Sequence, residues 1–262
     1  MSTASYTISE DGLEARVLNA AATADYSWIP RTAREIYIYG CDQPLSLMGV
    51  PPNITLVYIT NSAGVTDLTG LADSTESISL AGCERLQSLD PLPLKLLRLR
   101  IRSCPQLRWE PELLPSGLKS LEINDQAVVA SLAKIPRSIT YLSIRNLPGL
   151  ESLEGLPEGL ETLYLDSMPS VGKLSVLPDH LAVLGVSRST DIEAIPFRSS
   201  LKRLQIGDTR GYQVYTPDGQ DLIPDRRVKT GEEYFSLLAE YETFMEGRKK
   251  SAYSADPRSH RR

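Results

Sequence analysis

One short pattern of apolar positions recurs along most of the chain. An aliphatic motif L-x-x-L-x-L stands clearly at Leu160–Leu165 and returns, with substitutions, in other segments. The last apolar position of each copy falls at Ile38, Ile59, Leu80, Ile101, Ile123, Ile144, Leu165, Val186 and Ile206. The final x-L-x-L-x portion of each copy alternates with period two, which predicts a short strand with its apolar side chains on one face.

The spacing of the copies predicts the fold. An aliphatic residue followed by proline precedes most copies, as in Leu156-Pro157 and Leu177-Pro178. A coil of about 21 residues leaves no room for a full α-helix beside its strand, so we expect extended or 3₁₀ segments on the far side. A single coil cannot bury its apolar face, and neighbouring coils therefore stack. The sequence predicts a leucine-rich-repeat solenoid, with nine coils over residues 29–209 and a parallel β-sheet on its concave face.

Both ends of such a solenoid need a cap. Residues 1–28 form the N-terminal segment, in which residues 8–24 are expected to be a short helix. Residues 210–250 are expected to form the C-terminal cap, with a hairpin over 212–223 and a helix that begins after Thr230. The apolar stripe of that helix consists of Tyr234, Leu237, Leu238, Tyr241 and Phe244. The helix either packs on the last coil or binds a partner, and the breadth of the stripe favours packing. Residues 251–262 are expected to be disordered.

The three cysteines keep the phase of the repeat. Cys41, Cys83 and Cys104 each follow the last apolar position of a copy by three residues. This is the N/C position of the leucine-rich repeat, so we expect small, buried thiols with poor reactivity. An odd number of cysteines makes no disulfide framework and indicates a reducing compartment. Cys83 and Cys104 lie on adjacent coils, within reach of a disulfide, and we predict that they are reduced.

Composition and motifs exclude several classes of function. The net charge of −5 argues against a general nucleic-acid binder, and no apolar run is long enough to insert into a membrane. The chain has 2 histidines and contains no Gly-rich phosphate loop and no metal-ligand spacing. The sequence therefore predicts a monomeric binding protein that is not an enzyme and uses no cofactor or metal ion.

The repeat phase shows which side chains would face a partner. Outward strand positions carry tyrosines in the first coils and three arginines in the middle strand. The predicted partner-binding residues are Tyr37, Tyr39, Tyr58, Arg98, Arg100, Arg102, Glu122, Tyr141, Arg145, Tyr164 and Asp166. These residues form either a solvated face, with Glu122 and Asp166 as counter-charges, or an anion-binding site for an acidic or phosphorylated segment of a protein. Under the second interpretation, reversing Arg100 and Arg102 to Glu abolishes partner binding and leaves the fold intact.

The segments "LPEGLETLYL" and "LPDHLAVLGV" resemble the L-P-x-x-L-x-x-L-x-L/V repeats of bacterial leucine-rich-repeat effectors delivered by type III secretion. The resemblance covers residues 29–206 and implies a module that binds a host protein. The Ser/Thr/Ala-rich first residues fit an unstructured export signal or an ordinary frayed terminus. Some members of that family carry a ubiquitin-ligase domain with a C-x-D motif, but no cysteine follows Ile206, so we do not expect that activity. The alternatives are an adaptor or regulator in the bacterial cytoplasm, or a part of a ubiquitin-ligase system.

Overall fold

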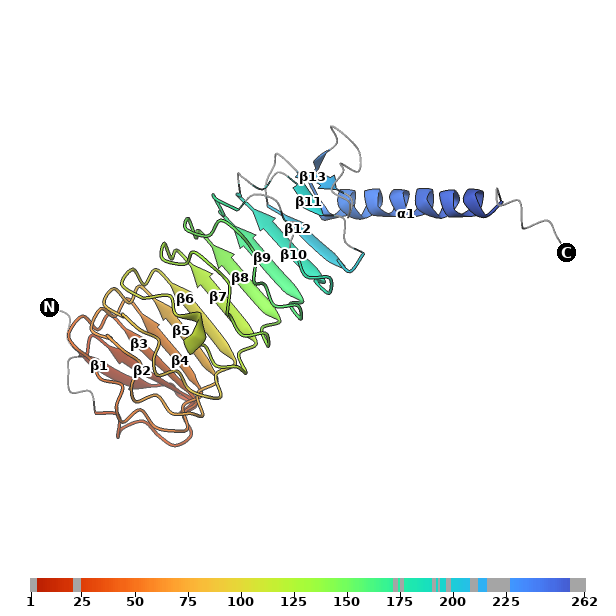
Figure 1. Ribbon diagram of the computed structural model, residues 1–262. Helices are drawn as coiled ribbons and strands as arrows, with labels where there is room; N and C mark the ends of the chain where they lie inside the picture. Colours follow the sequence, from red (N-terminus) through yellow and green to blue (C-terminus); the bar gives the residue numbers. More distant parts are fainter. Residues whose placement is uncertain are drawn as a thin grey trace.

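The chain folds into an elongated solenoid of stacked coils (Figure 1). The computed structural model describes residues 4–20, 25–171, 174, 177–189, 192, 194–196, 199–207, 212–215 and 227–254. Within these residues an 11-stranded sheet runs the length of the molecule in the order β1-β2-β3-β4-β5-β6-β7-β8-β9-β10-β12. The strands succeed one another in chain order, as expected of a leucine-rich-repeat solenoid.

The nine strands expected from the repeat are all present, and they are parallel and in register. They are β3 (Glu35–Tyr39), β4 (Leu56–Thr60), β5 (Ser77–Ala81), β6 (Arg98–Arg102), β7 (Ser120–Asn124), β8 (Tyr141–Arg145), β9 (Thr162–Asp166), β10 (Val183–Ser187) and β12 (Arg203–Ile206). Equivalent positions pair directly, since Leu99 lies opposite Ile78 on one side and Leu121 on the other. The predicted register of the repeat is therefore confirmed.

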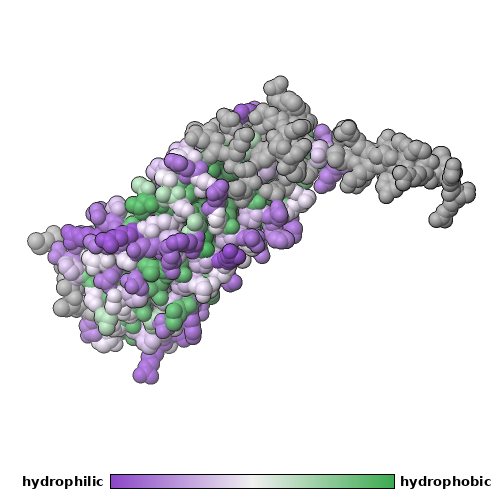
Figure 2. All heavy atoms as spheres, in the orientation of Figure 1, coloured by the Kyte–Doolittle hydropathy of each residue, from purple (hydrophilic) through white to green (hydrophobic). Residues whose placement is uncertain are grey.

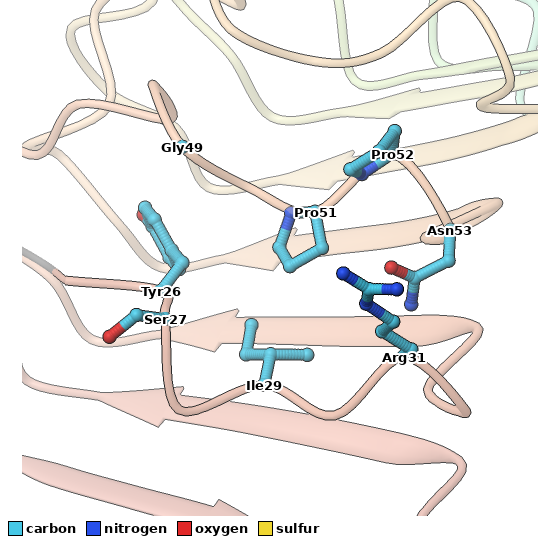
Figure 3. A pocket seen from close by; sticks show the side chains of 8 residues that line it. All are labelled: Tyr26, Ser27, Ile29, Arg31, Gly49, Pro51, Pro52 and Asn53. Atoms are coloured by element: carbon cyan, nitrogen blue, oxygen red, sulfur yellow. The ribbon is translucent and has the colours of Figure 1, made fainter.

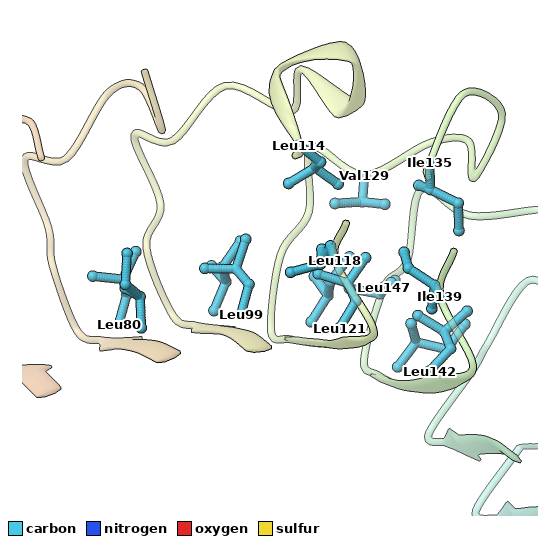
Figure 4. Packing of buried hydrophobic residues seen from close by; sticks show 14 of the residues in the cluster. Leu80, Leu99, Leu114, Leu118, Leu121, Val129, Ile135, Ile139, Leu142 and Leu147 are labelled. Carbon is cyan, nitrogen blue, oxygen red and sulfur yellow. The ribbon is translucent and has the colours of Figure 1, made fainter. Parts of the chain in front are cut away.

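The core is a continuous column of aliphatic side chains beneath the sheet (Figure 4). The second and fourth residues of each five-residue strand point inward, and Leu99 and Ile101 of β6 are both buried. Residues from the return segments, such as Leu114 and Val129, close the column from the other side. Each fully buried leucine stabilises the fold by about 1.5–3 kcal/mol, so stacking of the coils provides the main driving force.

Proline marks the turn that leads into most of the repeat strands. The amide of Ala33 donates to Pro30 O (3.1 Å), and the same bond joins Leu96 to Pro93 O (3.1 Å). The residue before a proline prefers an extended backbone, which keeps the return segment extended as it approaches the turn. One coil has an additional residue, and there the 3₁₀ helix η1 (Pro111–Leu113) lies in the return segment. The return segments contain no α-helix in the part of the chain that the structure describes.

A left-handed residue follows each of the strands β2 to β10, a feature that the hydrophobic pattern does not reveal. These residues are Asn19, Gly40, Asn61, Gly82, Ser103, Asp125, Asn146, Ser167 and Arg188, with φ between 47° and 66°. The bend turns the amide toward the next coil, so that Asn61 N donates to Ala81 O (2.7 Å) and Gly82 N to Arg102 O (2.9 Å). Glycine and asparagine tolerate this conformation best. Their recurrence at one position of the repeat is the sequence feature from which the bend could have been predicted.

The N-terminal helix predicted over residues 8–24 is wrong. The chain instead forms a hairpin of β1 (Ser5–Ile8) and β2 (Glu14–Leu18), which are antiparallel. Strand β2 then pairs in parallel with β3, Ala15 opposite Ile36, and so extends the sheet by one further coil strand. Ala15 and Val17 are buried with the period of two that a strand requires. Pairing with β3 outweighs the modest helix propensity of this segment, and the antiparallel β1 ends the sheet.

The C-terminal cap contains a second sheet and a helix. Strands β11 (Ala194–Pro196), β13 (Tyr212–Tyr215) and β14 (Arg227–Val228) form the sheet, in which β13 and β14 are antiparallel. The predicted hairpin over 212–223 is not confirmed, since β13 pairs with residues beyond it, Tyr212 opposite Val228, and residues 216–223 lie outside the described residues. Helix α1 (Gly231–Ser254) follows and extends away from the solenoid (Figure 1).

Helix α1 is attached to the solenoid through its first turns. Thr230 Oγ1 accepts the amide of Glu233 (3.1 Å), which confirms the predicted N-cap. Tyr234 and Leu237 are buried, and Tyr234 Oη donates to Pro196 O (3.1 Å). The side chain of Phe244 lies outside the described residues. The helix continues to Ser254, so the predicted disorder of residues 251–262 is wrong for its first four residues, and residues 255–262 are not described.

The cysteines lie where the repeat places them. Cys41, Cys83 and Cys104 are fully buried and are free thiols, which confirms their predicted burial. Cys41 Sγ accepts the amide of Ala20 (3.2 Å), as expected of the N/C position. A hydrogen bond with Cys104, together with burial, raises the pKa of the Cys83 thiol and keeps it protonated. That these thiols are reduced in solution stays a prediction.

Candidate partner-binding face

The outward residues of β2 to β10 and β12 form one continuous surface, which we call the sheet face. The first, third and fifth positions of each strand point away from the core, and most are half-buried or exposed. All of the predicted partner-binding residues lie at such positions, on β3, β4 and β6 to β9. The parallel register brings equivalent residues of adjacent strands side by side, so the face consists of three rows that cross the strands.

Aromatic residues dominate the N-terminal part of the sheet face. Tyr37 and Tyr58 stack with ring centroids 4.5 Å apart and planes 6° from parallel. Arg16 of β2 covers the other side of Tyr37, with its guanidinium carbon 5.7 Å from the ring centroid. Burial, followed by the hydrogen bond that Tyr37 Oη donates to Glu35 (2.8 Å), raises the pKa of Tyr37. Tyr39 lies at the exposed fifth position of β3, outside this stack.

The three arginines of β6 are not equivalent. Arg100 forms a two-pronged ion pair with Glu122, in which Nε and Nη2 each lie 2.8 Å from a carboxylate oxygen. The hydrogen bond to Glu122 raises the pKa of Arg100, and partial burial opposes this shift. The counter-charge interpretation therefore holds for Arg100, whose charge is compensated within the sheet.

Arg98 and Arg102 lack such compensation. Their neighbours across the sheet are neutral, since Ser77 and Ser120 flank Arg98 and Ala81 and Asn124 flank Arg102. Both arginines are exposed. Among the described residues, neither has an ion-pair partner. The middle of the sheet face thus presents two uncompensated cations, one at each end of the same strand.

Asp166 is the centre of a second ion-pair group on the sheet face. Arg145 lies 3.5 Å from this carboxylate, and Arg188 donates to it through Nε (2.9 Å) and through Nη2. Partial burial raises the pKa of Asp166, but the hydrogen bonds from Arg188 and Ser167 outweigh it, so the pKa is lowered. Arg188 was missed in the sequence because it stands one residue beyond β10, outside the alternating strand positions.

A hollow lies near the C-terminal end of the sheet face, beside Gly185. A Cβ atom at Gly185 would lie 2.3 Å from Cδ1 of Tyr164, so the ring occupies the space that any other side chain would need. Tyr164 also packs against Tyr141, with centroids 5.9 Å apart. The adjoining open hollow has a volume of about 380 Å³ and is lined by Tyr164, Gly185 and Gln205 among others. This part of the face can accept a protruding side chain of a partner.

Another open hollow lies on a different side of the first coils (Figure 3). It has a volume of about 680 Å³, and its walls are Tyr26, Ser27, Ile29, Arg31, Gly49, Pro51, Pro52 and Asn53. Its polar groups are used in the fold, since Tyr26 Oη donates to Ser46 O (2.9 Å) and Asn53 Nδ2 to Ala33 O (2.6 Å). Arg31 is the one charged side chain of this lining.

The described part of the chain has no group of three or more His, Cys, Asp or Glu side chains able to hold a metal ion. Nor does any described helix combine the length and apolar character needed to cross a membrane. The sheet face presents stacked aromatic rings and cationic side chains, which are the residue types enriched at the centres of protein interfaces.

Comparison with known proteins identifies no relative by sequence. No protein-family model matches the chain, and no curated protein matches it. Among solved structures, a leucine-rich repeat protein from Bacteroides ovatus is 15% identical, with a TM-score of 0.23. The match covers 81% of this chain and 91% of that chain. The leucine-rich-repeat fold follows here from the repeat, the register and the core.

Proposed function

We propose that the protein is a binding module that holds a protein partner on its sheet face and has no catalytic activity of its own. The observation that carries this proposal is the pair of uncompensated cations, Arg98 and Arg102, in the middle of that face. Stacked tyrosines lie at its N-terminal part. Arginine and tyrosine are enriched at the centres of protein interfaces, because they bury a large area and still form hydrogen bonds.

The partner binds with an acidic or phosphorylated segment. An arginine guanidinium binds carboxylates and phosphates in a two-pronged manner, and such charge-assisted bonds are the strongest available at a surface. Arg100 already makes this bond with Glu122, so Arg98 and Arg102 are the groups left to bind the partner's anions. The protein acts as a monomer, and its net charge of −5 disfavours nucleic acid as the ligand.

The partner is a host protein, and the chain acts as an effector exported by a type III-like system. This part of the proposal rests on the resemblance of the "LPEGLETLYL" and "LPDHLAVLGV" repeats to those of such effectors. The alternative is an adaptor in the bacterial cytoplasm. The two are separated by fusing residues 1–30 to a reporter in a bacterium with a type III apparatus. Apparatus-dependent secretion supports the effector, whereas retention in the cell supports the adaptor.

Reversing both uncompensated charges tests the binding face. The tagged full-length chain and its Arg98→Glu/Arg102→Glu variant are incubated with host-cell lysate, and the retained proteins are quantified by mass spectrometry. We expect retention of the specific partner to fall at least about tenfold, because each lost charge-assisted bond contributes about 1.5–3 kcal/mol. Arg100→Glu is a poorer test, since it would also place a second carboxylate beside Glu122.

A matched variant controls for net charge. Arg31→Glu/Arg137→Glu makes the same change of charge at two exposed turn residues away from the sheet face. We expect this variant to retain the partner as well as the unmodified chain does. Equal retention by the Arg98→Glu/Arg102→Glu variant, with an unchanged melting temperature, would contradict the proposed binding face.

A further inference from the structure

The coil that contains β6 also exposes two leucines, Leu94 and Leu97, where the other coils have different residues. Leu94 is 77% exposed and Leu97 is 37% exposed. Leu94 lies at the tip of the Pro93 turn, closed by the bond from Leu96 N to Pro93 O (3.1 Å). Leu97 directly precedes β6, and its amide donates to Glu76 O (2.8 Å). We call Leu94 and Leu97 the apolar edge.

The equivalent positions of other coils are mostly polar or charged. The turn position is occupied in successive coils by Arg31, Pro52, Asp73, Leu94, Ser116, Arg137, Glu158 and Asp179. The position before the strand is occupied by Arg34, Thr55, Glu76, Leu97, Lys119, Thr140, Glu161 and Ala182, and backbone bonds join these residues from coil to coil. Leucine at both positions is therefore not required by the fold. Figure 2 shows apolar surface among polar side chains over the middle coils on the face in view.

The apolar edge is continuous with the uncompensated charge of Arg98. Leu97 and Arg98 are adjacent in the chain, and both amides bond to the same carbonyl, Glu76 O, at 2.8 and 3.0 Å. Arg98 is the first residue of β6, at the end of the strand that lies toward the leucines. One coil thus combines exposed apolar surface with a cation that has no ion-pair partner among the described residues.

We infer that the apolar edge and Arg98 form one docking surface for a segment of a partner protein that carries an acidic residue beside apolar ones. The inference rests on the proposed function and specifies the partner's chemistry. An acidic group that reaches Arg98 brings its chain neighbours over Leu97 and Leu94, where apolar side chains gain free energy by leaving water. The two contacts reinforce each other, because closing the apolar contact also excludes water from the ion pair.

A partner protein fits this surface better than an anionic membrane or a second copy. Asp73 and Glu76 stand at the repeat positions next to Leu94 and Leu97, and they would repel a surface of uniform negative charge. A peptide segment can place a single carboxylate on Arg98 and keep clear of both acids. Two copies of a chain with a net charge of −5 repel each other at long range.

Peptide selection on the full-length chain tests the inference. Random 12-residue peptides displayed on phage are selected on the immobilised protein, and enriched sequences are synthesised with a fluorescent label. We expect them to carry an acidic residue beside apolar ones. The Kd, measured by fluorescence anisotropy, should rise at least about tenfold for Leu94→Ser/Leu97→Ser, because two apolar side chains lose their buried contact. The Arg98→Ser variant should weaken binding by a similar factor.

Leu113→Ser/Val128→Ser is the matched control. Leu113 is 37% exposed and Val128 49% exposed, and both lie in return segments, so this variant removes exposed apolar surface elsewhere. We expect its Kd to equal that of the unmodified chain. Circular dichroism checks that all variants keep the same melting temperature.

The other outcomes separate this inference from the proposed function. Peptides whose binding depends on Arg98 and Arg102 but not on the leucines would overturn the inference and leave the binding face intact. Binding that depends on neither would contradict both. Failure to enrich any sequence would overturn the inference. Binding of phosphatidylglycerol vesicles to the unmodified chain, but not to the Leu94→Ser/Leu97→Ser variant, would also overturn it. A dimer that this double variant converts to a monomer in light scattering would assign the surface to self-association and also overturn it.

Discussion

At the scale of single residues, the solenoid depends on a repeated left-handed bend as much as on its leucines. The bend directs each post-strand amide to a carbonyl of the next coil, as Ser103 N does to Asn124 O (3.1 Å). Glycine, asparagine and aspartate occupy most of these positions, but Ser103, Ser167 and Arg188 adopt the same φ with a side chain that disfavours it. These three positions are local weaknesses of the fold.

Replacing Ser103 by glycine should stabilise the protein. A left-handed residue with a side chain costs about 1–2 kcal/mol, whereas glycine loses about 0.5–1 kcal/mol of additional backbone entropy. The free energy of unfolding in urea should therefore rise by about 0.5–1 kcal/mol for Ser103→Gly. Ser116→Gly, at an exposed turn without positive φ, should bring no gain. A Ser103→Gly variant that is less stable than the unmodified chain would refute this account of the bend.

For the arginines of β6, the sequence predicted their position on the face but not their ion pairs. The sequence placed Arg98, Arg100 and Arg102 on one outward face and offered Glu122 and Asp166 as counter-charges, and the structure has both carboxylates in ion pairs. It could not predict which arginine is compensated, because that depends on rotamers across the strands. Only the three-dimensional arrangement separates Arg100, which is paired, from its two neighbours on β6.

At the scale of elements, the sequence predicted the strands that carry the repeat motif and missed those that lack it. Nine strands follow from nine copies of one pattern, since each copy supports the register of the next. Residues 14–18 lack the leucine motif. Alternating polarity over only five residues is too weak a pattern to favour a strand over a helix from the sequence alone. Their strand is stabilised by pairing with β3, a tertiary contact that local pattern does not contain.

Helix α1 should stabilise the end of the solenoid through Tyr234. This side chain is buried, and its hydroxyl bonds to Pro196 O (3.1 Å). Tyr234→Ala should cost about 3–5 kcal/mol locally, as expected for loss of a buried aromatic ring. Hydrogen exchange should then accelerate in α1 and β14 and stay unchanged in β4 to β8, because a repeat protein transmits stability between neighbouring coils. Ser236→Ala, on the exposed side of α1, is the control.

Unchanged exchange in α1 and β14 of the Tyr234→Ala variant would show that the helix does not depend on this contact. Faster exchange along the entire sheet would show that the solenoid unfolds as one cooperative unit, with the cap essential to all of it. Either outcome would contradict a local capping role.

At the scale of the whole molecule, the fold presents a long rigid surface and leaves its chemistry to the outward residues. The core side chains of every coil are similar, whereas the sheet face changes along the molecule, from stacked tyrosines to the arginines of β6 and then to a second tyrosine pair and the ion pairs of Asp166. Stacking against two neighbours fixes each strand, so a partner meets groups that are already in place and loses little entropy in ordering them. Because the repeat specifies the core positions and not the outward ones, it predicts the fold but not the identity of the partner.

Site-specific photo-crosslinking tests the central claim, that the sheet face is the binding surface, most directly. A benzoylphenylalanine residue is placed at Ser77 or Ser120, which flank Arg98 on β5 and β7, or at Val128 in a return segment. After irradiation in host-cell lysate, we expect the same partner to be linked to positions 77 and 120 and not to position 128. Linkage from position 128 alone, with none from positions 77 and 120, would contradict the claim.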